Sequence, residues 1–438
     1  MCYLPLGAHM KKDVDFIYEQ VDKHHDWFSK SIPMIASENI ISPMAREMLI
    51  SDFHDRYAEG APGARYYQGN IYVDEVEIRT QELAKKLFDA KYADVRPISG
   101  TVSNMAVLMA FGGPDKKITS VDVSSGAHIS SAAFGAVGLR GMSPITYPFD
   151  VDEMNIDVDG TRRMLMEEKP DLALFGQSVF LFPTPIKELQ DVLQEIGCHV
   201  WYDAAHVLGL IAGGEFQDPL REGVEVITGS THKTLPGPQH GILFGNPRDE
   251  ESRDKLFWSV FPGVLSNHHL HAMAALGVSL AEHMEFGRDY AKQIIKNAKA
   301  LAQALYEREF DVMCPHKGFT ESHTIAFDVR KYGGGGKAVE NMEEANMIAN
   351  KNLMPWDDVD TALNPSGIRL GSQELTRLGM KESHMVEVAE FIKRVVIDGE
   401  DTRKVREDVE EFRKDFQGIH YCYKEGMSAH KRFSFLKD

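Results

Sequence analysis

Cysteine is scarce in this sequence, with only four among 438 residues. They stand far apart, at Cys2, Cys198, Cys314 and Cys422, and no two of them form a C-x-x-C pair. This spacing indicates neither a disulfide framework nor a structural zinc knuckle. Because chains without disulfides are typical of reducing compartments, we expect a cytoplasmic protein.

Long hydrophobic runs are also absent. No stretch approaches the ~20 apolar residues that a transmembrane helix needs, and the first residues lack the basic and then apolar pattern of a secretory signal. Basic residues are outnumbered, because 48 Lys and Arg face 66 Asp and Glu, which gives a net charge of -18. This charge disfavours nonspecific binding to nucleic acid or to anionic membranes, so we expect neither as a partner.

Short apolar runs predict an α/β fold for the first two thirds of the chain. Runs at residues 172–175, 200–202, 224–228 and 242–244 alternate with helical stretches. Such alternation is typical of a mainly parallel sheet with helices on both faces. We therefore expect this part of the chain to form the larger of two domains.

The sequence divides into three predicted parts. They are an N-terminal helix and arm (1–60), a large domain (61–285) and a smaller α+β domain with a charged helical tail (286–438). A long helical stretch from His268 to about Glu309 leads out of the large domain. Within the small domain we expect a strand near residues 324–329, a glycine turn at 333–336, and helices near 382–396 and 405–416.

A lysine among small hydroxylated residues is the most informative local feature. The run Thr228-Gly229-Ser230-Thr231-His232-Lys233-Thr234 follows an apolar stretch. A lysine in this setting, beside a histidine, suits an amine that captures an aldehyde as a Schiff base. The alternative is an ordinary exposed lysine at a strand end, and the heptapeptide alone does not decide between the two.

A second segment ends an apolar strand with an aspartate and a histidine, in Trp201-Tyr202-Asp203-Ala204-Ala205-His206. Open α/β sheets bind ligands at such strand ends. A buried Asp203 needs a cationic partner, and the protonated pyridine nitrogen of pyridoxal 5'-phosphate would supply one. Alternatively, Asp203 caps a helix and His206 is a hydrogen-bonded core residue. The presence of Lys233 nearby in the sequence favours the cofactor.

A third segment places small residues before an apolar helical run. Ser99, Gly100 and Thr101 precede Val102 and the residues that follow it. Free N–H groups at a helix start bind phosphate, so these three residues are candidates for the cofactor phosphate. Taken alone, S-G-T before a helix is more often an ordinary cap.

These three segments occur in the order that fold-type I pyridoxal-phosphate enzymes use, and further motifs narrow the resemblance. The chain resembles the serine hydroxymethyltransferase family over about residues 12–395. It is most similar to the archaeal branch, although Gln239 and His240 stand where many bacterial and eukaryotic members have arginine and glycine. The motifs that carry the resemblance are Met34 to Asn39, Tyr57 to Gly60, Pro62-Gly63, Arg65 to Gly69, Tyr72 to Asp74, Asp203 to His206, Thr231 to Thr234, Val260 to Gly263, Asn350 to Asp358 and Ser366 to Gly371.

The resemblance implies a set of residues around Lys233. Lys233 would form the Schiff base with the cofactor, and Glu59, Tyr57 and His232 would be its catalytic companions. The implied cofactor-binding set is Ser99, Gly100, Thr101, His128, Ser178, Asp203, His206, Thr231, Lys233 and Gly263, in which His128 stacks on the ring and Ser178 hydrogen-bonds near its phenolic oxygen.

Substrate and pterin residues are implied in the same way. Arg369 would grip the substrate carboxylate, a task that suits a planar and permanently charged fork, and Ser37 and Tyr67 would help to hold the amino acid. Glu59 would act as a general acid if burial raises its pKa. The implied pterin-binding set is Glu59, Tyr66, Val123, Ala127 and Asn352.

The implied reaction is the reversible conversion of L-serine and a tetrahydropterin to glycine and the 5,10-methylene-pterin. The carrier is tetrahydrofolate or tetrahydromethanopterin, and the sequence leaves this choice open. The resemblance also implies a homodimer with active sites at the interface. In that assembly Tyr57, Glu59 and Tyr66 would reach into the site that holds Lys233 of the partner subunit.

Two other functions stay open at this stage. A pterin-independent aldolase that cleaves threonine or other β-hydroxy amino acids would use the same lysine and aspartate, but the Y-A-E-G and R-Y-Y segments match the pterin-binding branch. A regulatory or scaffold protein that binds the cofactor without turnover is the other alternative. His268, His269 and His271 resemble a metal cluster, but no fourth ligand is near in the sequence, so we expect no metal site.

Overall fold

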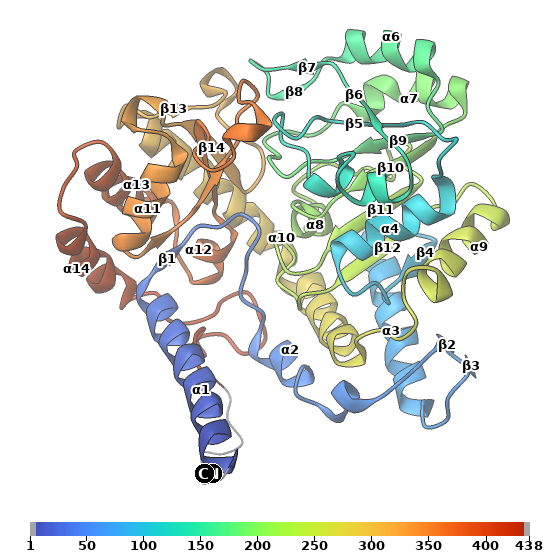
Figure 1. The fold of residues 1–438 in the computed structure, drawn as a ribbon, viewed down its shortest axis with the longest axis horizontal. Coiled ribbons are helices and arrows are strands. Elements are labelled where there is room, and N and C mark those ends of the chain that lie inside the picture. Colours follow the sequence, from blue (N-terminus) through green and yellow to red (C-terminus); the bar gives the residue numbers. More distant parts are fainter. Residues whose placement is uncertain (1–5, 433–438) are drawn as a thin grey trace, which may run out of the picture.

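The computed structural model describes residues 6–432, in which a seven-stranded and a four-stranded sheet lie side by side among helices (Figure 1). The larger sheet has the strand order β4-β12-β11-β10-β9-β5-β6. All its neighbouring strands run parallel except at β12, which is antiparallel to both β11 and β4. Its strands are β4 (Tyr92–Asp94), β5 (Ile118–Ser120), β6 (Pro144–Thr146), β9 (Leu172–Phe175), β10 (His199–Asp203), β11 (Val226–Ser230) and β12 (Gly241–Gly245).

Successive residues of the central strands enter two different hydrophobic cores. Tyr202 and Phe244 belong to one core, whereas their strand neighbours Trp201 and Leu243 belong to the other. This alternation follows from the two-residue period of a strand, and burial on both faces explains why the strands read as continuous apolar runs. The first core is covered by α3 (Ile71–Phe88), α6 (Val158–Glu168), α7 (Ile186–Ile196) and α8 (Leu208–Ala212), and the second by α4 (Gly100–Phe111), α5 (Ala136–Leu139) and α9 (Glu250–Trp258).

The smaller sheet is antiparallel and has its own core. Its strand order is β13-β14-β17-β16. A short strand of the N-terminal arm, β1 (Ile32–Pro33), pairs in parallel with β15 (Met347–Ile348), so the arm packs with this half of the molecule. The elements here are β13 (Asp311–Val312), β14 (Thr324–Asp328), β16 (Asn350–Asn352), β17 (Gly367–Gly371), α11 (Gly335–Glu344), α12 (Gln373–Arg377), α13 (Glu382–Val396) and α14 (Thr402–Arg413).

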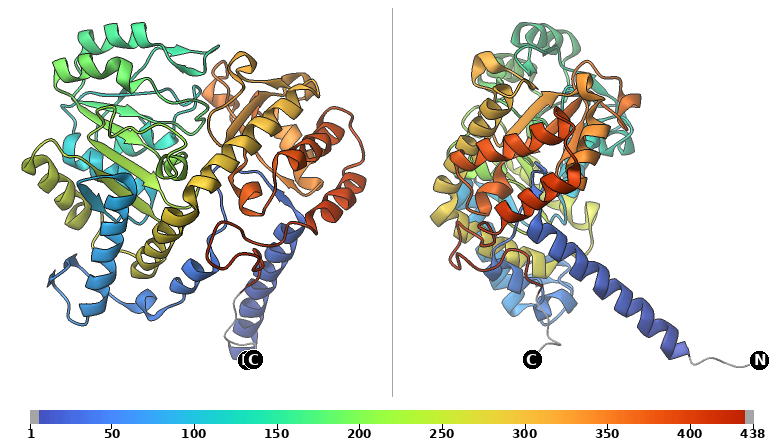
Figure 2. Two further views of the ribbon diagram at one scale, coloured as in Figure 1. Left: turned by 180° about the vertical axis from the view of Figure 1, so that it is seen from behind. Right: turned by 90° about the vertical axis from the view of Figure 1, so that its left-hand side faces the viewer.

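One long helix, α10 (Leu270–Tyr306), belongs to both halves. Its buried side chains from Leu270 to Ile294 enter the core of the larger sheet, and those from Ala298 to Leu305 enter the core of the smaller one. The helix therefore crosses the molecule obliquely between the two sheets (Figure 2). The predicted boundary at residue 285 falls inside this continuous helix.

Several local expectations can be compared directly with the structure. The strand predicted at 172–175 and the helix predicted at 382–396 have the observed bounds of β9 and α13. The glycine turn was only half right. Gly333 and Gly334 have positive φ angles of 99° and 90°, but Gly335 and Gly336 already belong to α11. A Cβ atom at Gly335 would collide with the Gly367 carbonyl, so the helix approaches β17 through its glycines.

The N-terminal region projects from this body. Helix α1 (Leu6–Lys30) extends away from both sheets (Figure 2), and α2 (Pro43–Met48) leads to a hairpin of β2 (Gly60–Ala61) and β3 (Ala64–Arg65). A further two-stranded pair joins β7 (Phe149–Asp150) to β8 (Asn155–Ile156). Cys2 lies outside the described residues, and Cys198, Cys314 and Cys422 are buried free thiols. Between residues 6 and 432 there is no helix that combines the length and apolar character required to cross a membrane.

A buried charge cluster fixes the β2–β3 hairpin to α3. Arg65 donates from Nη2 to Glu77 Oε2 at 2.6 Å and from Nε to Asp74 Oδ1 at 2.8 Å. Its Nη1 donates to the carbonyls of Ala58 and Gly60. His268 Nε2 lies 3.2 Å from Glu77 Oε2. Burial alone would raise the pKa of the Glu77 carboxyl, but His268 and Arg65 outweigh burial and hold that pKa below its ordinary value.

We expect Glu77→Gln to lower the free energy of unfolding by about 2 kcal/mol at pH 7, because it removes the charge that Arg65 and His268 face in a buried site. The pKa of Glu77 is lower in the folded than in the unfolded state, so its contribution is present above the unfolded pKa. The difference between variant and wild type should disappear as the pH falls through the folded pKa. Urea denaturation at several pH values measures this, and Glu75→Gln, at an exposed position of the same helix, is the control. Equal loss in both variants would contradict the role of the cluster.

Candidate active site

Lys233 lies in the loop after β11 and is buried, with 7% of its surface exposed. Its carbonyl accepts a hydrogen bond from Asn39 Nδ2 at 2.5 Å, and the neighbouring Thr234 Oγ1 donates to the His206 carbonyl at 2.7 Å. Burial lowers the pKa of Lys233 to about 8, against the opposing attraction of Asp203. An amine with this pKa is partly neutral near pH 7 to 8, so it can act as a nucleophile.

Asp203 is the last residue of β10 and stands beside Thr228 of β11 in the sheet register. Its Oδ1 accepts from the Ala205 N–H at 3.0 Å, and its Oδ2 accepts from Asn104 Nδ2 at 2.8 Å. Both donors, a backbone N–H and a side-chain amide, are neutral. The partly buried carboxylate forms no ion pair with a lysine or arginine of the described residues, although Lys233 interacts with it electrostatically, so it has room for the cationic group of a ligand.

His206 lies three residues after Asp203 and is buried beside the loop that holds Lys233. Its Nδ1 has no hydrogen-bond partner among the described residues. The ring lies 5.7 Å from the His323 ring at an interplanar angle of 23°. Burial holds the pKa of His206 well below its ordinary value and lowers that of His323 to about 3, so both rings are neutral. An unpartnered ring nitrogen in a buried place is a polar group that a ligand can satisfy.

Arg369, on β17, brings a guanidinium to the same place from the smaller sheet. Its side chain is buried and donates to the Ser178 carbonyl at 3.1 Å and to Asn350 Oδ1 at 3.3 and 3.4 Å. No carboxylate of the described chain forms an ion pair with it, and burial lowers its pKa to about 10. A buried guanidinium without an anion is costly, so the site suits a ligand that carries a carboxylate.

The predicted phosphate-binding segment lies at the N-terminus of α4. Ser99 is the N-cap, and its Oγ accepts from the Val102 N–H at 3.2 Å. Gly100 packs against Ser230 at the end of β11, and a Cβ atom at this glycine would collide with the Ser230 hydroxyl. Thr101 is exposed beside them. The N–H groups at this helix start therefore lie next to the strand that leads to Lys233, where they can bind a phosphate.

His128 and Ser178 lie on two loops that pack against each other. Gly126 has a φ of +104°, and its carbonyl accepts from the Ser178 N–H at 2.6 Å. Burial lowers the pKa of His128, although Asp203 opposes this shift. Ala127 is buried, and Val123 is partly buried in the same loop. The Ser178 carbonyl contacts Arg369, so these loops join the groups of the two sheets.

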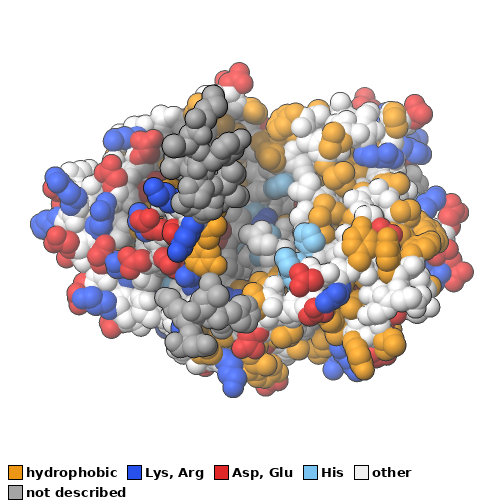
Figure 3. All heavy atoms as spheres, turned by 60° about the horizontal axis from the view of Figure 1, so that its bottom comes forward, with side chains coloured by type: hydrophobic (Ala, Val, Ile, Leu, Met, Phe, Trp, Pro, Cys, Tyr) orange, Lys and Arg blue, Asp and Glu red, His pale blue; other side chains and the backbone are white. Residues whose placement is uncertain are grey.

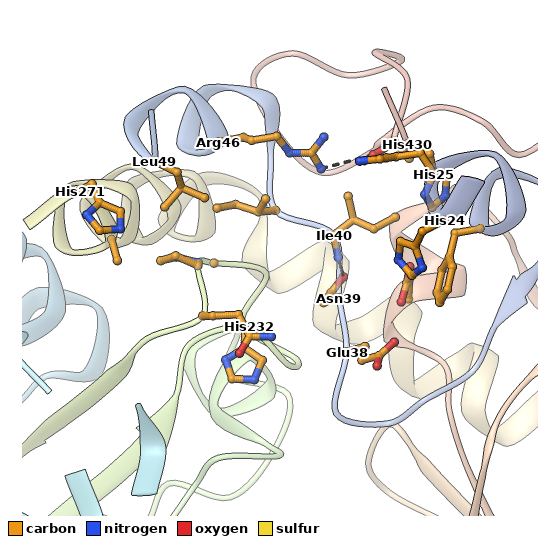
Figure 4. Close-up of a pocket in the computed structure, with 18 of the residues that line it drawn as sticks. His24, His25, Glu38, Asn39, Ile40, Arg46, Leu49, His232, His271 and His430 are labelled. Atoms are coloured by element: carbon orange, nitrogen blue, oxygen red, sulfur yellow. Dashed lines mark hydrogen bonds between the residues drawn. The ribbon is translucent and has the colours of Figure 1, made fainter. Parts of the chain in front are cut away.

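A cavity of about 620 Å³ opens next to His232 and is visible as a hollow between the halves of the molecule (Figure 3). Glu38 and Asn39 line it from the arm, and further histidines line it from α1 and from the start of α10 (Figure 4). His232 Nδ1 has no hydrogen-bond partner in the described part of the chain, and burial lowers the pKa of His232 to about 4. Thr231, by contrast, is fully buried, and its Oγ1 donates to the Pro238 carbonyl at 2.8 Å.

Three predicted site residues, Tyr57, Glu59 and Tyr66, lie apart from this group. They belong to the segment around the β2–β3 hairpin, at the lower edge of the molecule in Figure 1. Tyr57 and Tyr66 are 45% and 71% exposed, and Glu59 is partly buried. The Tyr57 ring contacts Tyr67, and the Tyr66 ring lies 6.0 Å from Phe261. Among residues 6–432 no hydrogen bond joins this hairpin segment to Lys233 or Asp203.

The other predicted residues occupy three further places. Ser37 is partly buried in the arm loop, which Gln373 Nε2 ties down through the Ile35 and Glu38 carbonyls. Asn352, on β16, donates to the Leu353 carbonyl at 2.6 Å. Gly263 packs against Met109 of α4. His268 contacts Glu77, and no group of three or more metal-binding side chains is present between residues 6 and 432.

Two asparagines at the site were missed by sequence reasoning. Asn104 bonds to Asp203, and Asn350 bonds to Arg369. Asn104 carries an amide in the mostly apolar run that forms α4, and this contrast is a usable signal. Asn350 stands two residues before Asn352, so the period of a strand places both on one face of β16.

Comparison with known proteins agrees with this geometry. The family model described as serine hydroxymethyltransferase matches residues 10–392. A protein of Picrophilus torridus with this name is 56% identical over 426 residues, which is 97% of each chain. A protein of the same name from Methanocaldococcus jannaschii is 54% identical over 94% of this chain and 96% of its own, and one from Thermoplasma acidophilum is 53% identical over the same shares.

The predicted resemblance and the predicted fold class are thereby confirmed. The family is one of fold-type I pyridoxal-phosphate enzymes, and the mixed seven-stranded sheet with helices on both faces has that architecture. The family match covers both sheets and α10, including Lys233, Asp203 and Arg369. The chain therefore belongs to the serine hydroxymethyltransferase family.

Proposed function

We propose that this chain interconverts L-serine and glycine with a reduced pterin as the one-carbon carrier, and that the groups around Lys233 form its active site. One observation carries this proposal. A partly neutral lysine and a guanidinium without an anion are buried at the meeting point of the two sheets, and a partly buried carboxylate that forms no ion pair within the described residues lies with them. A pyridine nitrogen and an amino-acid carboxylate are the two charges that would complete them.

Family membership implies pyridoxal 5'-phosphate, and the residues present fit it. Lys233 would hold its aldehyde, Asp203 its ring nitrogen, and the N–H groups at Ser99 to Thr101 its phosphate. The unpartnered Nδ1 of His206 and the packed Gly100 are consistent with a ligand in this place. When bound, the cofactor supplies an electron-withdrawing ring that weakens the bonds at the amino-acid Cα. Further contacts would come from His128, Ser178, Thr231 and Gly263.

Arg369 would bind the substrate carboxylate with the two parallel N–H groups of its fork. In the described chain these groups are held by the Asn350 side chain and the Ser178 carbonyl, which orient the guanidinium without neutralising it. Ser37 and Tyr67 would make further contacts with the amino acid. His232, neutral because of burial, would accept or hold a proton beside Lys233.

A homodimer would bring the hairpin segment to the active site. The hairpin and the start of α3 expose large apolar side chains, with Tyr66, Ile71 and Tyr72 at 71%, 76% and 79% exposure. Exposed apolar clusters of this kind are typical of subunit interfaces. In a two-fold dimer, Tyr57 and Glu59 would enter the partner's site, where Glu59 would serve as the general acid and contact the pterin. Tyr66, Val123, Ala127 and Asn352 would line the pterin site.

The division of the chain into an arm, a large domain and a small domain is also our proposal. It is supported by the two separate cores, which α10 joins, although arm residues 32–40 pack with the small domain. We place the protein in the cytoplasm, where its three described cysteines would stay reduced.

Serine turnover with two pterins tests the function. We expect glycine to form from serine when tetrahydrofolate or tetrahydromethanopterin is added, and the better of the two identifies the carrier. Glycine formation that is independent of both pterins would favour the aldolase reaction instead. Cofactor binding without any turnover would favour a regulatory protein. Lys233→Ala is the control, because it removes the only amine assigned to the cofactor aldehyde.

Arg369→Lys should weaken serine binding by about 2 kcal/mol while pyridoxal phosphate stays bound, because an ammonium cannot reproduce two parallel hydrogen bonds. Serine titrations of the loaded protein, followed by absorption, measure this change. The matched control is Arg330→Lys, at an exposed arginine of the same half of the molecule that pairs with Asp328. Unchanged serine affinity in Arg369→Lys would remove the carboxylate role.

The shared site can be tested by mixing two inactive proteins, Lys233→Ala and Glu59→Ala, under conditions of subunit exchange. If Glu59 serves the partner's site, each heterodimer contains one intact site and activity returns. The control mixture combines Lys233→Ala with Arg369→Ala. Both residues lie in the site of one chain, so every site keeps a lesion and activity stays absent. Demonstrated exchange without recovery in the first mixture would show that Glu59 acts within its own chain.

A further inference from the structure

A chain of buried hydrogen bonds runs from the core of the large sheet to two groups that face the cofactor site. Trp201 Nε1 donates to Thr228 Oγ1 at 2.8 Å, and Thr228 Oγ1 donates to Asn104 Oδ1 at 2.7 Å. Asn104 Nδ2 then donates to Asp203 Oδ2 at 2.8 Å and approaches Ser130 Oγ at 3.3 Å. Trp201, Thr228 and Asn104 are at most 4% exposed, so water has little access to these bonds.

The direction of this chain follows from the chemistry of its two ends. An indole N–H can only donate, so the hydroxyl of Thr228 must accept from Trp201 and use its own proton elsewhere. That proton goes to Asn104, which fixes the amide with its oxygen toward Thr228. The amide NH₂ is then turned toward Asp203, which as a carboxylate can only accept. No member of the chain can reverse without leaving a buried donor unpaired.

The same direction extends through Ser130 to His128. Ser130 Oγ lies 2.8 Å from His128 Nδ1, and the Ser130 N–H donates to the same nitrogen at 3.2 Å. A nitrogen that receives two donors carries no proton, so the neutral imidazole is protonated at Nε2. The Ser130 hydroxyl accepts from the Asn104 amide, so its own proton is not used in that contact and can be donated to His128 Nδ1.

We propose that Asn104 is the positioning residue for this site: it aligns the Asp203 carboxylate and, through Ser130, holds His128 as the tautomer protonated at Nε2. Thr228 and Trp201 fix the orientation of the Asn104 amide. The proposal rests on the proposed function, in which Asp203 and His128 bind the cofactor ring. Asn104, Thr228 and Trp201 would orient Asp203 and His128 for cofactor binding and would not contact the substrate.

Replacement of Thr228 separates positioning from packing. Thr228→Val keeps the shape but removes the hydroxyl, so the Asn104 amide loses its orientation, whereas Thr228→Ser keeps the hydroxyl. We expect the dissociation constant of pyridoxal phosphate, measured by titration of the cofactor-free protein, to rise about tenfold or more in Thr228→Val and in Asn104→Ala. Thr228→Ser should stay within about threefold of the wild type.

Thr119→Val is the matched control. Thr119 is another fully buried threonine of the same sheet, and its hydroxyl bonds to Tyr147 instead of the Asn104 network. It should lose a similar amount of thermal stability but leave the cofactor affinity and absorption maximum unchanged. If Thr228→Val and Thr119→Val affect affinity and absorption equally, the network does not position the cofactor groups and the proposal fails.

Neutron diffraction of deuterated wild-type crystals tests the tautomer directly. We expect deuterium on His128 Nε2 and on Thr228 Oγ1 in the direction of Asn104. Deuterium on His128 Nδ1, or a flipped Asn104 amide, would overturn the inference. If the wild type binds no pyridoxal phosphate, the proposed function fails, and the tautomer and amide orientation in cofactor-free crystals still decide this inference.

Discussion

Burial of charges that the chain itself leaves incomplete is the constraint on which the site depends. Asp203 and Arg369 form no ion pair within the described residues, and Arg369 is buried whereas Asp203 is partly buried. Each group carries a desolvation cost that only a ligand of opposite charge offsets. Lys233, which interacts electrostatically with both groups, is buried, and burial lowers its pKa to about 8. The site therefore favours a ligand that carries a cationic group for Asp203 and a carboxylate for Arg369.

The two sheets must keep a fixed relative position, because the charged groups of the site come from both. Lys233 and Asp203 come from the large sheet, whereas Arg369 comes from the small one. A third element, the arm loop, closes the connection. Asn39 bonds to the Lys233 carbonyl and to the Tyr290 hydroxyl, and Gln373 holds the same loop through two carbonyls. Hydrogen bonds from neutral amide side chains fix position without adding charge, so they align the site and leave its electrostatics unchanged.

Sequence reasoning found what depends on local pattern and on family motifs. The strands appeared as apolar runs because both faces of the sheet are buried, and the family and its activity followed from motifs spread along the chain. Asn104 and Asn350 were missed because their local signals, an amide in a mostly apolar helix and the period of a strand, do not reveal their partners, which lie 99 and 19 residues away in the sequence. Gly335 was misread as turn because glycine serves both flexible turns and close packing. The roles of Tyr57 and Glu59 stay predictions, since the proposed roles depend on a second subunit.

The path of α10 has a consequence for how the molecule loses its structure. One continuous helix supplies the wall of both cores, from Leu270 to Ile294 in one and from Ala298 to Leu305 in the other. Unfolding of either half would expose the apolar side chains of α10 that pack in that half. The helix would then fray toward the turns that pack in the other half. The two halves are thus coupled into a single cooperative unit, in spite of their separate sheets. A cut at residue 285 would separate the core of the larger sheet from Tyr290, Ala291 and Ile294 of this helix, and the core of the smaller sheet from Ile32 and Met34 of the arm, so neither half would keep a complete core.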